Sequence, residues 1–176
     1  EEGSYPTTYI PTSGATVTRL ADVGTNTGTV DDFNSEEGVL FVEMRALVIS
    51  GTNREISISS GVYSNTLRIV YSSTNTINIL FRKTNSTLYS LNVALIDSID
   101  LIKIALRYSD IGLDVFLNGV LTNSTIIDSS FPINTINSLQ LNRGDDIAGF
   151  FEGEIKNLQV FKSAKSDAFL QQLTTL

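Results

Sequence analysis

Glu152 and Glu154 stand at alternate positions before an apolar run, and such a pair could hydrolyse a glycosidic bond. Two carboxylates on one face of a strand, about 5 Å apart, can act as the acid and the nucleophile of a retaining glycosidase. No third acid follows this pair, and Glu55 has Ser57 where a partner acid would stand. We therefore expect solvated strand positions and a chain that is not an enzyme.

The composition limits the kinds of site and partner that the chain can have. The 176 residues include no cysteine and no histidine. This excludes disulfides, zinc sites with Cys or His ligands, and nucleophilic sites that need a histidine base. A net charge of -7 argues against general nucleic-acid binding, which needs a basic field. No run approaches the roughly 18 apolar residues that span a bilayer, so we expect no membrane insertion.

Basic residues recur between apolar ones in several of the predicted strands. Successive side chains of a strand point to opposite faces. If the apolar neighbours face the core, one set of polar residues faces outward: Arg68, Asn78, Arg82, Lys103 and Arg107. One interpretation is a groove for an anionic glycan, such as a sulfated or uronic polymer. The other is cross-strand ion pairing with Glu43, Glu55 and Asp114, which stabilises a surface little. Parity does not say whether these strands share a sheet.

Sugar recognition also uses an exposed aromatic ring, and tryptophan is absent. Tyr71 and Tyr108 share their parity with apolar neighbours, so we expect both at the edge of the core. Tyr63, in the loop SSGVYSN, is the exposed candidate for stacking on a sugar.

Short apolar or alternating runs, separated by turn residues, extend from Gly38 onward and predict an all-β fold. The short connections, including Asn118-Gly119, favour antiparallel pairing in two packed sheets. One helix is expected at residues 166–173, where Ser166 can cap the N-terminus. The predicted strands cover residues 38–48, 54–60, 66–72, 76–83, 87–93, 100–109, 112–120, 137–142 and 153–161.

Two stretches carry a resemblance to a known family. FNSEEGVLFVEMRA resembles the opening strand of laminin G-like, concanavalin A-like lectin/glucanase domains, and GFFEGEIKNLQVFKSAKSDAFLQQL resembles their last strand and terminal helix. The resemblance implies a concanavalin A-like jelly roll, a two-sheet antiparallel β-sandwich with a short C-terminal helix. Domains of this kind often bind calcium through loop carboxylates, which would here be Asp145 and Asp146, with Asp110 and Asp22 as partners. The fold hosts enzymes, lectins and structural modules alike.

The leader EEGSYPTTYIPTSGATVTRLADV resembles a linker from an upstream carbohydrate-binding-like module in phage tail and virion proteins, especially those associated with Bacteroidetes. We therefore expect a linker over residues 1–14 and a laminin G-like domain over residues 15–176. The expected function is a non-catalytic carbohydrate-binding or adhesion module of a phage tail, virion or bacterial surface protein. Its partners would be a polysaccharide or cell-surface glycan and sibling modules, and its location the virion or cell surface. The alternative is a structural spacer or decoration module that mediates protein assembly.

Overall fold

The computed structural model of the chain describes residues 13–14, 27–46, 53–73, 75–97, 99–145 and 147–176. Within these residues the chain forms ten strands and one short helix. The elements are β1 (Gly38–Ala46), β2 (Arg54–Ser59), β3 (Thr66–Ser73), β4 (Thr76–Lys83), β5 (Ser86–Ala94), β6 (Ile102–Tyr108), β7 (Leu113–Leu117), β8 (Val120–Thr125), β9 (Ser138–Gln140), β10 (Gly153–Phe161) and α1 (Asp167–Thr174).

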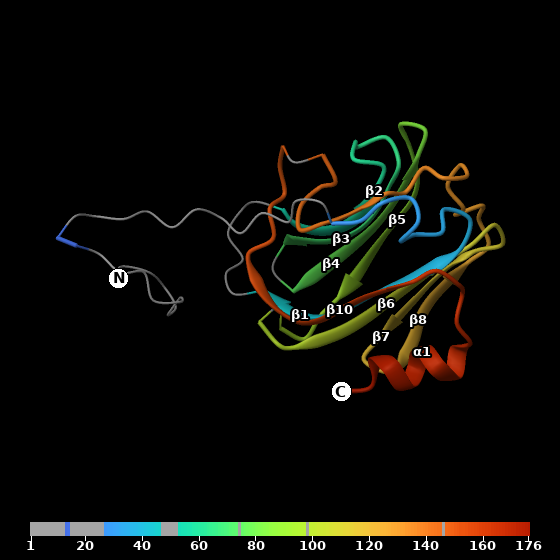
Figure 1. Cartoon of the computed structure of the whole chain (residues 1–176). Helices are drawn as coiled ribbons and strands as arrows, with labels where there is room; N and C mark the ends of the chain where they lie inside the picture. The colour runs from blue at the N-terminus through green and yellow to red at the C-terminus, as the bar shows by residue number, and fades with distance from the viewer. Residues whose placement is uncertain (1–12, 15–26, 47–52, 74, 98, 146) are drawn as a thin grey trace.

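The strands form two antiparallel sheets that pack face to face (Figure 1). Sheet 1 has the order β10-β1-β6-β7-β8, and sheet 2 has the order β5-β4-β3-β2-β9. Neighbouring strands pair antiparallel throughout both sheets. The predicted fold class, an all-β two-sheet sandwich with a short C-terminal helix, is confirmed.

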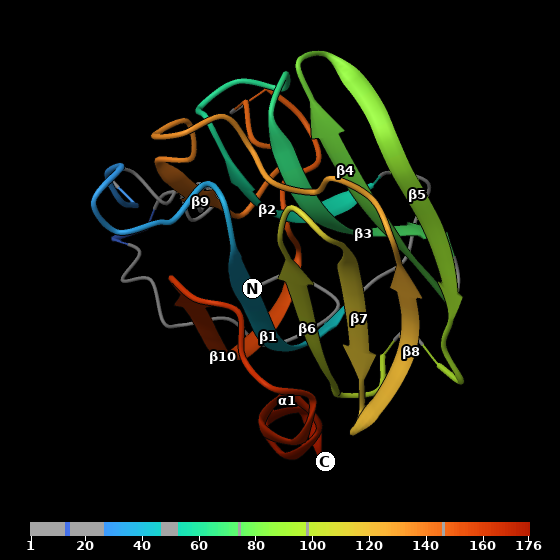
Figure 2. The same ribbon diagram turned by 90° about the vertical axis from the view of Figure 1, so that its right-hand side faces the viewer.

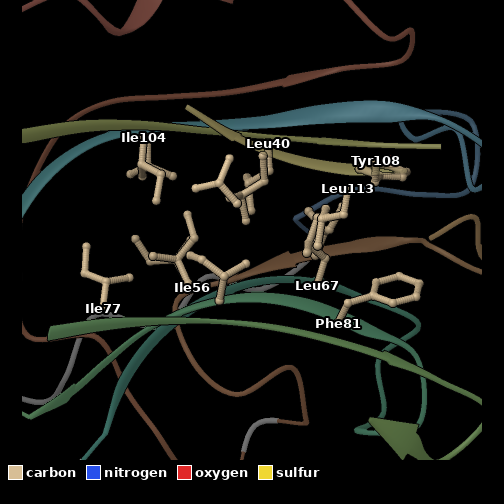
Figure 3. Packing of buried hydrophobic residues seen from close by; sticks show 14 of the residues in the cluster. Leu40, Ile56, Leu67, Ile77, Phe81, Ile104, Tyr108 and Leu113 are labelled. Atoms are coloured by element: carbon tan, nitrogen blue, oxygen red, sulfur yellow. The ribbon is translucent and has the colours of Figure 1, made fainter. Parts of the chain in front are cut away.

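The core lies between the sheets and follows from strand alternation. Ile56 on β2 and Leu67 on β3 point inward and meet Leu40 and Ile104 of sheet 1 (Figure 3). Aromatic rings extend this core, because Phe131 packs 4.8 Å from Phe81 and 5.9 Å from Tyr108 between ring centroids. Tyr71 and Tyr108 are both fully buried, as their parity predicts.

The tight turns are built from residues that tolerate positive φ. Asn118 and Gly119 join β7 to β8 with φ of 48° and 84°, and Asn85 turns the β4–β5 hairpin with φ of 67°. The return strand β8 is not among the predicted strands. Its sequence, VLTNST, is polar after its second residue and therefore lacks the apolar alternation that marks a strand.

Helix α1 covers the outer face of sheet 1 (Figure 1). The Ser166 hydroxyl accepts a hydrogen bond from the Phe169 amide at 3.3 Å, so the predicted cap is confirmed. Leu170 is fully buried against Val39, Phe41 and Phe116. The helix thus shields an apolar strip that the outer face of a sandwich would otherwise expose to water.

Several predictions fall on residues beyond those described. The predicted linker over residues 1–14 lies outside the described residues except for 13–14, and so do Asp22 and Asp146. Among the described helical residues, none form a segment with the length and apolarity to cross a bilayer.

Candidate functional site

Three arginine side chains surround the ring of Tyr63, which lies in the loop between β2 and β3. The guanidinium carbons of Arg82, Arg68 and Arg143 lie 4.2, 4.7 and 4.8 Å from the ring centroid. All three distances are within the roughly 6 Å over which an aromatic ring attracts a cation. We refer to Tyr63, Arg68, Arg82 and Arg143 as the arginine cluster.

Two members of the cluster are positioned by the pairing of β3 with β4. Leu67 and Phe81 face each other in the core, so their neighbours Arg68 and Arg82 point to the outer face of sheet 2. Thr66 pairs with Arg82, which leaves the two arginines diagonal to each other, within reach of long side chains. The strand register therefore brings two cations to the same end of one sheet face.

Arg143 reaches the cluster from the loop that follows β9. Gly144, with φ of +94°, lets this loop lie directly on the sheet, since an added Cβ would stand 3.0 Å from Ser59 Cβ and from Thr66 Cγ2. Ser59 and Thr66 are consequently buried, although both belong to an outer face. The close contact fixes Arg143 beside Tyr63.

The first ion pair of the site is buried. Arg68 donates to the Glu55 carboxylate at 2.6 Å, and the two side chains are only 3% and 2% exposed. Arg68 also donates to the Tyr63 hydroxyl at 3.2 Å. Burial raises the pKa of Glu55 above its ordinary value, and the guanidinium of Arg68 offsets part of that rise.

The second ion pair lies within the loop. Arg143 donates to one oxygen of Asp145 through two nitrogens, at 3.0 and 2.5 Å, and the Ile147 amide donates to the other oxygen. Burial alone would raise the pKa of Asp145, but these hydrogen bonds outweigh it and hold the pKa below its ordinary value. Arg143 is therefore already occupied by an internal carboxylate.

Arg82 differs from the other two arginines because its partners are all neutral. Its guanidinium donates to the Tyr63 carbonyl at 3.3 Å, to Thr87 Oγ1 at 2.8 Å and to the Asn85 carbonyl at 2.6 Å. Within the described part of the chain it forms no ion pair. Among the described residues, three guanidinium groups thus face two carboxylates, and the guanidinium of Arg82 is left as a fixed positive charge on an acidic molecule.

Of the predicted site residues, Tyr63, Arg68 and Arg82 come together, while Asn78 lies on the same face but is engaged elsewhere. The Asn78 amide donates to Ser90 Oγ at 3.1 Å and to Asn92 Oδ1 at 2.9 Å. Asn78 therefore ties β4 to β5. We assign it no place in the cluster.

The single groove envisaged from strand parity does not form, because Lys103 and Arg107 belong to sheet 1. Their outward face is on the opposite side of the sandwich, where α1 covers it. Arg107 pairs with Asp114 and Asp167, both at 2.7 Å, and Lys103 donates to the Thr175 carbonyl at 2.8 Å. These two residues hold the helix onto the sheet. The cross-strand pairing that was the alternative interpretation is thus found for Arg107 with Asp114 and, on sheet 2, for Arg68 with Glu55.

Arg143 is the member of the cluster that sequence reasoning missed. It lies in the tripeptide Arg143-Gly144-Asp145, part of a loop where no periodicity assigns a face, and only the carboxylates of this loop carried a prediction. In the structure the tripeptide is folded inward, because Gly144 is buried against the sheet and Asp145 pairs with Arg143. The glycine at position 144 was the sequence signal for a tight loop, and its φ of +94° is a conformation that glycine adopts readily.

The described residues do not fit a calcium site at Asp145. Both of its carboxylate oxygens are engaged by Arg143 and Ile147, and Asp110 lies in the β6–β7 turn. No group of three or more acidic side chains that could hold a metal ion occurs within the described ranges. Because Asp146 lies outside those ranges, calcium binding there stays a prediction.

The two glutamates considered for catalysis are paired with arginines. Glu152 accepts from Arg54 at 2.7 Å, and Glu154 from Arg45 at 2.6 Å. Each of the two carboxylates therefore has a structural role as the partner of an arginine.

Comparison with known proteins shows similarity in fold. No family model matches the sequence, and no curated protein matches it. The chain is similar to the CBM40 of the Ruminococcus gnavus IT-sialidase bound to α2,3 sialyllactose, with a TM-score of 0.69 and 17% identity over 89% of this chain and 95% of that one. It is also similar to domain 4 of a GH43 extracellular arabinanase from Geobacillus stearothermophilus, in complex with arabinotriose, with a TM-score of 0.61 and 12% identity over 84% and 70%. A leech intramolecular trans-sialidase matches at a TM-score of 0.66 and 20% identity, over 81% of this chain and 24% of that one.

Proposed function

We propose that this chain is a non-catalytic carbohydrate-binding module that recognises an acidic glycan through the arginine cluster. The observation that carries the proposal is Arg82, a guanidinium held by three neutral acceptors beside an aromatic ring. Its charge is in place before any ligand arrives, so little side-chain entropy is lost on binding.

The chemistry of recognition follows from the guanidinium group. A planar guanidinium can bind a carboxylate or sulfate through two parallel hydrogen bonds, which are stronger than neutral ones. Tyr63 serves here to orient the cations, because its half-buried ring lies against all three guanidinium groups. A carboxylated or sulfated sugar therefore suits the cluster better than a neutral one.

The similar structures support this proposal. The CBM40 module was solved with α2,3 and also with α2,6 sialyllactose, and sialic acids carry a carboxylate. The arabinanase domain binds a neutral saccharide on the same kind of sandwich. For this chain the arginine cluster favours the acidic class.

The proposal also concerns the larger protein that carries this module. We place the module in a larger protein of a phage tail, virion or bacterial surface, following the resemblance of its leader. Weak binding by each module would then be multiplied by the number of copies on one particle.

The proposal is tested by calorimetry with 3′-sialyllactose, an oligogalacturonate and lactose. We expect the acidic saccharides to bind and lactose to bind at least about tenfold more weakly, because it lacks the anion. Arg82→Gln should reduce acidic binding at least about tenfold, since a charge-assisted pair contributes about 1.5–3 kcal/mol. Repeating the titrations with calcium and with a chelator tests the calcium prediction separately.

Arg45→Gln is the matched control, because Arg45 belongs to an exposed pair on β1 in sheet 1. It should leave binding unchanged. Equal binding of lactose and sialyllactose, or an Arg82→Gln variant that binds like the wild type, would remove the arginine cluster from the function.

A further inference from the structure

Within the described residues, four strands lie at the edges of the two sheets, and they differ in how they are protected. An edge strand exposes unpaired N–H and C=O groups, and proteins usually prevent pairing there with charge, proline or short length. On one side of the sandwich, β10 carries Glu154 and Lys156, and β9 has only three residues. On the other side, the nine residues of β5 and the six of β8 include no charged residue and no proline.

The two unprotected edges form one continuous side of the molecule. The Tyr89 hydroxyl of β5 donates to Asn123 Oδ1 of β8 at 2.6 Å. Figure 2 shows β5 and β8 along the same flank, each at the end of its sheet. Apolar side chains are exposed on both, with Leu88 at 49% and Val120 at 61%. In a chain with 31 charged residues among 176, these two neighbouring edge strands stand out because neither contains a charged residue.

Of the two strands, β5 is the better template for a further strand. Its pairing with β4 is regular from Tyr89 to Ala94, and its single irregularity lies before Tyr89. In β8 the irregularity falls between Leu121 and Asn123, near the middle of a shorter strand. Irregularities of this kind twist an edge and interrupt its row of hydrogen-bonding groups.

We propose that β5 pairs antiparallel with β5 of a second copy, which joins the two copies of sheet 2 into one ten-stranded sheet. Antiparallel self-pairing is isologous, so the same segment supplies both halves of the interface. The charge of the chain favours this position, because two molecules of net charge -7 repel each other least where neither carries charge. Leu88 and Val120 would bury apolar surface beside the joined strands.

Dimerisation through β5 would also strengthen glycan binding, and only this effect rests on the proposed function. Arg82 lies on β4, the strand next to β5. Pairing through β5 would set two arginine clusters on the same face of one continuous sheet. A polymeric glycan could then engage both clusters at once and gain avidity.

The test is sedimentation velocity of the protein over a concentration series. We expect a monomer–dimer equilibrium with a Kd of about 10 µM, as for a small interface. The double variant Leu88→Lys/Ala94→Lys places like charges across the pair and should weaken dimerisation at least about tenfold. Both positions are exposed, so circular dichroism and the melting temperature should stay at wild-type values.

The control variant, Val120→Lys/Thr122→Lys, adds the same charge to β8 and should leave dimerisation nearly unchanged. Hydrogen exchange of the wild type gives a second measurement, with stronger amide protection of residues 89–94 in concentrated than in dilute samples. A protein that is monomeric at every concentration would overturn the proposal, as would a dimer that the β8 variant disrupts and the β5 variant does not. If the wild-type protein dimerises as expected but does not bind the acidic saccharides, that result would count against the proposed function alone.

Discussion

The two outer faces of the sandwich each carry basic side chains at alternate strand positions, but those side chains have different partners. On sheet 1, Arg107 and Lys103 bind the two ends of α1 and the neighbouring Asp114. On sheet 2, Arg68 and Arg82 surround Tyr63, and Arg82 has neutral partners in the described structure. The same sequence pattern thus attaches helix α1 on the face of sheet 1 and forms a candidate ligand site on the face of sheet 2.

The difference arises from what the chain lays over each face. The C-terminal segment covers sheet 1 and supplies the Asp167 carboxylate, which pairs with Arg107. It also supplies the carbonyls of Lys165 and Thr175, which accept hydrogen bonds from Arg107 and Lys103. The loop after β9 covers part of sheet 2 and supplies another cation, Arg143, together with Asp145. A segment that covers a sheet face can therefore either pair with the basic side chains of that face or bring a further basic side chain to it.

The largest expected effect comes from breaking the buried pair on sheet 2. Arg68→Ala leaves the Glu55 carboxylate buried without its cation, and we expect a loss of about 3–5 kcal/mol in the free energy of unfolding at pH 7. Burial would then raise the pKa of Glu55 further in the folded state. The variant's deficit should therefore shrink as the pH falls toward the unfolded pKa of about 4.3 and widen as the pH rises above it.

Urea unfolding at several pH values measures this effect. The double variant Arg68→Met/Glu55→Met is the control, because replacing both partners with apolar groups should restore most of the stability. A loss below about 1 kcal/mol for Arg68→Ala would show that the pair is not buried as described.

A smaller effect should follow from loosening the helix on sheet 1. Leu170→Ala creates a cavity against Phe41 and Phe116, and we expect a loss of about 3 kcal/mol in unfolding free energy. Leu176→Ala, at an exposed position, should change the stability by less than about 0.5 kcal/mol. Glycan binding by folded Leu170→Ala should equal that of the wild type, and a binding loss would mean that the two faces are coupled.

The Arg107→Ala variant tests whether the attachment of α1 to sheet 1 is independent of ligand binding on sheet 2. It leaves Asp114 partly buried without its guanidinium, and we expect a loss of about 2 kcal/mol in thermal or urea unfolding. Arg45→Ala breaks an exposed pair and should cost about 0.5 kcal/mol. If Arg107→Ala weakened glycan binding as much as Arg82→Gln, the contrast between the two faces would not hold.

The smallest effect concerns the internal carboxylate of the arginine cluster. Asp145→Asn removes the negative charge that occupies Arg143, so we expect affinity for an acidic glycan to rise about threefold in calorimetry. Asp128→Asn is the matched control, because Asp128 pairs with Lys83, which is not a member of the cluster. An unchanged or lower affinity for Asp145→Asn would indicate that Arg143 takes no part in binding.

Much of the fold can be predicted from local patterns in the sequence. Alternation located nine of the ten described strands, and the residues at Asn118-Gly119 and Ser166 set a hairpin and a helix start. Strand β8 escaped prediction because it lies at a sheet edge and turns mostly polar residues toward solvent. The candidate site was predictable only in part, since Tyr63, Arg68 and Arg82 were found but Arg143 was not.

The sequence by itself determined which side chains point outward, because the alternation of a strand is a local property of the backbone. It also determined the acidic net charge and the absence of histidine and cysteine chemistry. Only the tertiary structure decided that Arg68 and Arg82 share a face while Arg107 lies on the opposite one. That choice depends on which strands pair and on which segment returns to cover each sheet, and both are set by contacts between residues far apart in the chain.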